Sequence, residues 1–350
     1  MGESGLLATI LATNAAAAAR VDAEVRAVLD EPTGHVVPEG HLLIGPGDDA
    51  AVWQPPPGRA LVVTQDALVE GVDFHRDWTT PHLLGRRCLA VSLSDLAAMG
   101  ATPAFCVVTL CAPGDTPLAD VEALHGGIEE IAGQLGCPLV GGDVSAIAGP
   151  LVLDVVAAGT VDPALTLRRD TGRPGDLLLV TGRLGRAAAG LRLLQAAPPV
   201  AVAQAGVEQA WRAAQLDPAP RLAEGLFLAA AGVRCAGDLS DGLLVDARRT
   251  AAASRCAAEL WRDALPVDAE LGQVFHDEWL DLTAGGGEDF ELLAAVDPAQ
   301  VEALRRDWPD DLAPLSVVGR LVAGEGVRLL DHEGGAELAL PRVGSRHFGS

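Results

Sequence analysis

Residues 44–52 read Ile44-Gly45-Pro46-Gly47-Asp48-Asp49-Ala50-Ala51-Val52, so two adjacent carboxylates lie between a Gly-Pro-Gly bend and an apolar run. Glycine permits tight turns, and the apolar residues predict the start of a strand. We therefore expect Asp48 and Asp49 at a loop–strand junction rather than on a solvated face. Two close carboxylates repel each other unless a cation lies between them, and oxygen ligands suit Mg²⁺. For this motif alone, an acidic surface turn is the alternative.

The composition is that of a globular protein with a strong negative charge. The 350 residues suffice for two domains, and 49% of them are hydrophobic while 21% are charged. The net charge of −23 argues against nucleic acids and anionic membranes as partners. If the ligand is a phosphate, divalent cations could neutralise both the ligand and the acidic site that binds it.

Missing residue types exclude some chemistry. The chain has no lysine, so all 25 basic residues are arginines, and a Schiff base and a P-loop lysine are ruled out. Codon bias in a GC-rich genome is the favoured explanation, and salt adaptation stays open. The six cysteines form no CxxC pair, no secretory signal is visible and no apolar run has transmembrane length. We therefore expect reduced thiols in a cytoplasmic protein.

The first half of the chain predicts an α+β domain. Apolar segments predict strands over residues 61–64, 105–110, 139–144 and 151–161. Helical spacing predicts helices over 83–99 and 118–135, the second with Gly136 as its C-cap, which suggests one sheet with two helices on one face. An Ala-rich stretch over 6–29 predicts further helix. The predicted division is a helical extension at 1–40, an N-terminal domain at 41–162 and a C-terminal domain at 163–350.

The second half predicts a separate α/β layer. A strand over 177–181, a glycine turn and an Ala-rich helix from Ala187 are similar to the opening of a dinucleotide-binding unit. The spacing of the glycines does not match GxGxxG, so we favour a tight strand–helix turn. Further strands are predicted over 315–322 and 327–330. A helix over 245–257 should point its N-terminus at the loop around Ser240, which favours phosphate binding.

Acidic loops flanked by glycine or serine recur in both halves. They lie around Asp49, Asp66, Asp95, Asp143, Asp238 with Asp241, and Glu288. For Asp95, in an apolar helix, the alternative is a carboxylate on a solvated helix face. The triple glycine before Glu288 predicts that Glu288 and Asp289 start a strand. So many carboxylates fit several divalent ions that bridge a polyphosphate between two domains, with catalysis by positioning and charge neutralisation.

Six motifs, in this order along the chain, resemble those of the thiamine-monophosphate kinase family within the aminoimidazole ribonucleotide synthetase-like superfamily. They lie at residues 45–52, 64–71, 92–100, 141–143, 238–243 and 286–292. The resemblance implies ATP-dependent phosphorylation of thiamine monophosphate to thiamine diphosphate by direct in-line transfer with several Mg²⁺ ions. It also implies a homodimer in which the N-terminal sheets join into a barrel, with the C-terminal domain closing the active-site cleft.

The resemblance assigns roles by motif, and it names no catalytic side chain. Metal-binding positions fall on Asp49, Thr64, Gln65, Asp66, Asp95, Asp143, Asp238 and Asp241. ATP-binding positions fall on Gly142, Asp143, Arg169 and Ser240. Substrate-binding positions fall on Asp73, Glu288 and Ser345.

Three positions depart from the family's pattern. Gln65 replaces a Thr, Asp73 replaces a His, and Ser345 replaces an aromatic residue. The last two lie on the acceptor side. Two alternatives stay open: another ATP-dependent enzyme of the superfamily with a different small substrate, and a non-catalytic nucleotide-binding regulator.

Overall fold

The structure is a computed structural model that describes residues 40–196, 202 and 204–343. The predicted helix over 6–29 and the substrate position Ser345 lie outside these residues. The chain divides into two compact units. The first holds residues up to 96 together with 102–163, and the second holds 97–101 and the residues from 164 onward.

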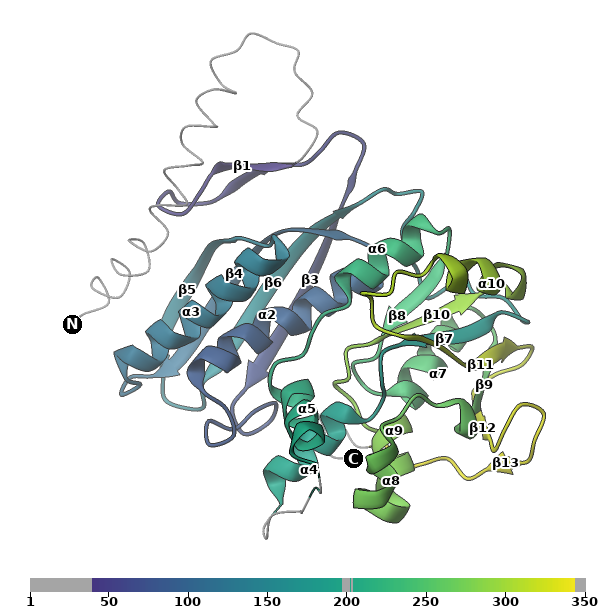
Figure 1. Cartoon of the computed structure of the whole chain (residues 1–350). Coiled ribbons are helices and arrows are strands. Elements are labelled where there is room, and N and C mark those ends of the chain that lie inside the picture. Colours follow the sequence, from purple (N-terminus) through teal and green to yellow (C-terminus); the bar gives the residue numbers. More distant parts are fainter. Residues whose placement is uncertain (1–39, 197–201, 203, 344–350) are drawn as a thin grey trace. The chain divides into compact units, whose positions relative to one another are not determined.

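The first unit is a four-stranded sheet with two helices on one face (Figure 1). The order is β3-β6-β4-β5, in which only β4 and β5 are parallel. The elements are β3 (Ala60–Val69), α2 (Pro81–Ala98), β4 (Thr102–Pro113), α3 (Leu118–Leu135), β5 (Leu139–Ile147) and β6 (Val152–Val161). A separate hairpin pairs β1 (His41–Ile44) with β2 (Val52–Gln54). The predicted α+β class, sheet and helices are therefore confirmed.

Strand β3 sorts its side chains between two environments. Thr64, Asp66 and Leu68 alternate on the more buried face, whereas Leu61 and Val63 on the opposite face are 53% and 58% exposed. Successive side chains of a strand point to opposite faces, so a run of three candidate site residues, 64–66, cannot share one face. This alternation puts Thr64 and Asp66 on one face and Gln65 on the other.

Helices α2 and α3 cross in backbone contact because glycines lie at the crossing. A Cβ on Gly85 would lie 2.0 Å from the carbonyl oxygen of Leu124, and a Cβ on Gly127 would lie 2.0 Å from that of His82. Helix α3 then ends at Gly136, whose φ of 66° gives the left-handed C-cap that the sequence predicted.

The second unit contains a seven-stranded sheet. Its order is β13-β12-β9-β11-β7-β10-β8, and β12 with β9 is the parallel pair. The strands are β7 (Leu177–Thr181), β8 (Cys235–Asp238), β9 (Ala257–Trp261), β10 (Leu292–Val296), β11 (Leu315–Val322), β12 (Val327–Leu330) and β13 (Glu337–Leu338). The strands predicted over 177–181, 315–322 and 327–330 are confirmed.

Helices and short 3₁₀ turns fill the connections of the second unit. They are α4 (Arg186–Gln195), α5 (Ala205–Leu216), α6 (Leu222–Ala230), α7 (Leu243–Ala253), η1 (Arg262–Ala264), α8 (Ala269–Phe275), η2 (His276–Glu278), α9 (Trp279–Ala284) and α10 (Pro298–Asp307). The core includes Leu178, Leu239 and Leu260, each fully buried. Helix α7 begins and ends earlier than the helix predicted over 245–257. Ala257, the predicted last residue of that helix, starts β9 instead. Among the described helices, none has both the length and the apolar character needed to cross a bilayer.

The helix crossing predicts opposite effects of two adjacent substitutions in α3. Gly127→Ala places a methyl group against the backbone of α2, so we expect a loss of about 1–3 kcal/mol in the free energy of unfolding. Gly126→Ala is the control: it lies on the exposed side with no atom within 4 Å of its Cβ, and should gain about 0.5–1 kcal/mol. Chemical denaturation measures both, and equal stabilities of the two variants would contradict the close crossing.

Candidate active site

Thr64, Asp66 and Asp95 form an oxygen-rich group in the first unit. Thr64 and Asp66 come from β3, and Asp95 comes from α2. The Thr64 hydroxyl donates a short hydrogen bond to Asp95 Oδ2. Asp66 Oδ2 is buried and has no hydrogen-bond partner among the described residues. Burial, and then the charge of Asp95, raises the pKa of the Asp66 carboxyl.

This group fits a hard divalent cation. Its donors are all oxygens and its two carboxylates repel each other; one buried Asp66 oxygen has no partner within hydrogen-bond distance, while the nearby Ser92 hydroxyl partly offsets the raised pKa. In the described part of the chain, however, no three His, Cys, Asp or Glu side chains gather closely enough to hold a metal ion. A cation here would therefore need water or phosphate oxygens as further ligands. Asp95 faces Thr64, so the alternative of a solvated helix-face carboxylate is wrong.

Gln65 lies apart from this group. Its side chain points to the opposite face of the sheet, where Nε2 donates to Asp154 Oδ1 and Oδ2 at 3.0 and 2.8 Å. The structure thus does not bring the Gln65 amide together with Thr64 and Asp66. Only its backbone remains available for the predicted metal contact.

Asp49, Gly142 and Asp143 line one cavity of about 460 Å³ in the first unit. Residues 45–51 contribute one part of its lining, and apolar residues of α3 and β4, such as Leu124 and Val108, contribute another. Gly142 is required by sterics, because a Cβ there would lie 2.0 Å from the Val108 carbonyl oxygen. The expectation that Asp49 is shielded from solvent is wrong for this chain by itself, since the residue is exposed. The loop nevertheless lies at the cavity, next to Asp143.

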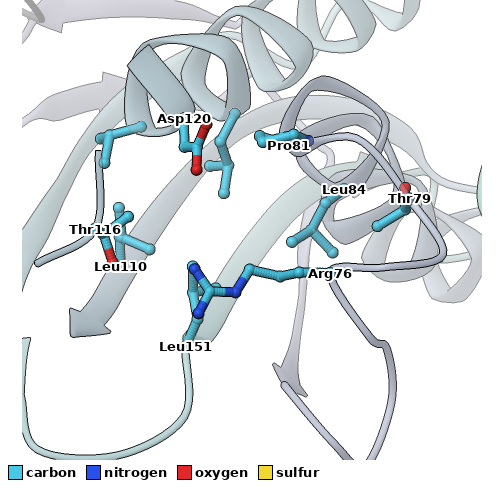
Figure 2. Close-up of a pocket in the computed structure, with 10 residues that line it drawn as sticks. Arg76, Thr79, Pro81, Leu84, Leu110, Thr116, Asp120 and Leu151 are labelled. Carbon is cyan, nitrogen blue, oxygen red and sulfur yellow. The ribbon is translucent and has the colours of Figure 1, made fainter. Parts of the chain in front are cut away.

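Asp73 is used locally in the structure. Its Oδ2 accepts the N–H of Val69 at 2.8 Å, which closes the turn after β3. A cavity of about 130 Å³ in the same unit contains none of the predicted site residues (Figure 2). The Arg76 guanidinium borders it, opposite Asp120, and donates to Glu70 at 2.8 Å. The Arg76 guanidinium beside this cavity is thus already paired with Glu70.

In the second unit, Asp238 and Arg169 form an ion pair. Asp238 ends β8 with 2% of its surface exposed, and Arg169 Nη2 lies 3.0 Å from its Oδ1. Gly237 makes room for this contact, because a Cβ there would lie 2.6 Å from Arg169 Nε. The predicted metal position and the predicted ATP position are therefore neighbours.

Ser240, Asp241 and Glu288 also lie in neighbouring segments. The Glu288 N–H donates to the Ser240 carbonyl oxygen at 2.8 Å, and a Cβ on Gly287 would lie 2.6 Å from the same oxygen. Arg249 pairs with Asp241. The prediction that Glu288 starts a strand is wrong: β10 begins at Leu292, and Glu288 lies in a loop with φ of 66°. The glycines before Glu288 allow its loop to pack closely against the Ser240 loop, and they do not start a strand.

The sequence predicts no role for two further carboxylates, the buried Asp246 and the partly buried Asp289. Asp246 accepts the Asp241 N–H at 3.0 Å, and burial raises its pKa to about 6. Asp289 accepts the N–H groups of Gly185 and Ala187 at 2.7 and 3.1 Å, which caps α4, and burial raises its pKa to about 7. In the sequence, Asp289 is marked only by its position beside Glu288. Asp289 and Ala187, whose N–H it accepts, are 102 residues apart, so no local pattern predicts this helix cap.

Known proteins match both halves of the chain. The family model described as AIR synthase related protein, N-terminal domain, matches residues 47–161, and the C-terminal domain model matches residues 173–332. A thiamine-monophosphate kinase of Synechococcus elongatus is 36% identical over 315 residues, which covers 86% of this chain and 91% of that protein.

Solved structures agree with these matches. A thiamine-monophosphate kinase from Stenotrophomonas maltophilia is similar with a TM-score of 0.75 and 39% identity, covering 87% of this chain and 94% of that one. AaThiL complexed with AMPPCP and TMP is similar with a TM-score of 0.70 and 25% identity, covering 88% and 91%.

The raised pKa of Asp289 predicts a pH dependence of stability. With a pKa of about 7 when folded and 3.8 ordinarily, the folded protein holds a proton that the unfolded chain releases. Raising the pH from 4 to 7 therefore lowers the free energy of unfolding. Asp289→Asn keeps an acceptor oxygen but cannot titrate. The free energy of unfolding of this variant, minus that of the unsubstituted protein, should therefore increase between pH 4 and pH 7, by up to about 4 kcal/mol. Denaturation at several pH values measures this difference, and a flat difference would contradict the assignment.

Proposed function

The chain belongs to the thiamine-monophosphate kinase family of AIR synthase related proteins, and we propose that it transfers the γ-phosphoryl group of ATP to thiamine monophosphate, giving thiamine diphosphate. The observation that carries the proposal is the Thr64–Asp66–Asp95 group, with its repelling carboxylates and its unpartnered buried oxygen. A phosphoryl-transfer site needs such oxygens to hold the cations that accompany a polyphosphate.

Mg²⁺, when bound, would neutralise phosphate charge during the transfer. In the first unit the residues proposed to hold it are Thr64, Asp66, Asp95, Asp49 and Asp143. In the second unit they are Asp238 and Asp241. Each of the latter two carboxylates already contacts an arginine, Asp238 with Arg169 and Asp241 with Arg249.

The residues proposed for the ATP side form two separate groups, an apolar cavity in the first unit and polar side chains in the second. The cavity lined by Gly142 and Asp143 is large enough for part of a nucleotide, and its apolar wall suits a flat nucleobase. Arg169 and Ser240 are the predicted phosphate contacts of the second unit. Arg169 is 40% exposed, so its guanidinium is accessible to an anionic ligand while it pairs with Asp238.

The transfer itself needs no protein nucleophile or general base. A phosphate monoester has its second pKa near 6, so the acceptor oxygen of thiamine monophosphate is already ionised at neutral pH. That oxygen attacks the γ-phosphorus directly, and ADP leaves with the electron pair of the broken bond. The chain's residues therefore act by alignment and charge neutralisation, and Glu288 attracts the cationic acceptor. The local hydrogen bond of Asp73 argues against a direct role for it in acceptor binding.

We also propose a homodimer formed through the open face of the β3-β6-β4-β5 sheet. Leu61 and Val63 are exposed there, and an apolar sheet face that is left in solvent is typical of an interface. The six cysteines are all free, which is compatible with the reducing cytoplasm expected from the sequence.

Activity is tested by the conversion of thiamine monophosphate to thiamine diphosphate with ATP and Mg²⁺. Asp66→Asn should lower kcat by roughly 100-fold or more, because it removes a charged ligand from the transferring phosphate's surroundings. Asp115→Asn, at an exposed position in the turn after β4, is the matched control and should retain activity. ATP consumption with another acceptor would indicate a different enzyme of the superfamily, and ATP binding without any turnover would indicate a regulator.

The dimer proposal is tested by a charge on the open sheet face. Val63→Asp should shift the protein from dimer to monomer in light scattering at micromolar concentration, because it buries a charge in the interface. Val72→Asp is the control, since Val72 is 68% exposed in the turn after β3. A monomeric unsubstituted protein, or an unchanged mass for the Val63 variant, would contradict the interface.

A further inference from the structure

Gln215 is a buried amide that reaches the loop of Glu288. It lies at the end of α5 with 3% of its surface exposed, and its Nε2 donates to Glu288 Oε2 at 2.6 Å. The packing of α5 on α4 fixes its position. A Cβ on Gly190 of α4 would lie 2.1 Å from the Trp211 carbonyl oxygen and 3.1 Å from Gln215 Cβ, so the two helices touch at this level.

The Glu288 backbone is held from the other side. Its φ of 66° is unusual for a residue with a side chain, and its N–H donates to the Ser240 carbonyl oxygen at 2.8 Å. The residue as a whole is half-buried. Backbone and side chain are thus both oriented, the first by the Ser240 loop and the second by Gln215.

Stability alone does not explain an amide at position 215. Gln215 Oε1 is buried and has no hydrogen-bond partner among the described residues, which carries a desolvation cost that an apolar side chain would avoid. The contact also differs from that of Glu291, whose carboxylate is neutralised by Arg221 through bonds of 2.7 and 2.6 Å. An amide donor orients a carboxylate without cancelling its charge.

We propose that Gln215 is a positioning residue for acceptor binding: it fixes the Glu288 carboxylate in the orientation that meets the cationic ring system of thiamine monophosphate. This inference rests on the proposed function. It assigns acceptor selection in part to α5, a helix that carries no residue of the family motifs. Gln215 acts through Glu288 and does not touch the reacting phosphates.

The test separates acceptor binding from ATP binding and from folding. Gln215→Met keeps the side-chain length and removes the donor, and it should raise KM for thiamine monophosphate roughly tenfold. KM for ATP should stay within about twofold, and the melting temperature should change little, because the lost hydrogen bond to Glu288 is offset by removal of the unpartnered Gln215 oxygen. Gln209→Met, at an exposed position of the same helix, is the matched control and should change neither KM.

A double-mutant cycle with Glu288→Gln tests the route of the effect. If Gln215 acts through the Glu288 carboxylate, Gln215→Met should no longer raise KM for the acceptor in the Glu288→Gln background. An unchanged acceptor KM in the single variant, an equal rise in both KM values, or the same rise in both backgrounds would overturn the inference. Failure of the proposed function would show earlier, as absence of acceptor conversion by the unsubstituted protein, and would overturn both.

Discussion

Repulsion between carboxylates is the constraint on which this structure depends. The chain carries 48 acidic and 25 basic residues, so acids cannot all find a cation within the protein. In the second unit, buried acids meet arginine: Asp238 meets Arg169, Glu291 meets Arg221, and Glu259 meets both Arg320 and Arg328. In the first unit, Asp66 and Asp95 have no arginine within ion-pairing distance among the described residues. The uncompensated pair therefore marks a place where a cation from outside the chain would relieve repulsion, whereas the pairs of Glu291 and Glu259 belong to the scaffold.

The sequence predicted the features that depend on local pattern. Alternation and apolar runs located β7, β11 and β12, and helical spacing followed by Gly136 located α3. The acidic motifs were also found from the sequence, because glycines and carboxylates at strand ends are local signals. Strand alternation by itself places Gln65 on the face opposite Thr64 and Asp66, whereas the family motif groups all three residues.

The remaining features depend on contacts between distant segments. The triple glycine at 285–287 predicts the start of a strand, whereas in the structure Gly287 allows close packing against the Ser240 loop, which is more than 40 residues away in sequence. The Asp289 cap of α4 and the Gln215 contact with Glu288 likewise join elements far apart along the chain. No local pattern distinguishes Gln215 from a surface glutamine, because its burial follows from how α5 packs on α4. Such residues become visible only when tertiary structure is known.

The glycine contact between α2 and α3 has a consequence for how this site can change in evolution. Asp95 lies ten residues from Gly85 on the same helix, or about 15 Å along its axis. Since backbone meets backbone at the crossing, α2 has no side-chain layer that could absorb a shift. A change in the size of residues around Gly85 or Gly127 would therefore move the whole helix and alter the separation of Asp95 from Thr64 and Asp66. The affinity of this group for a cation can thus change through substitutions of core residues that contact no ligand, without any substitution in the acidic motifs.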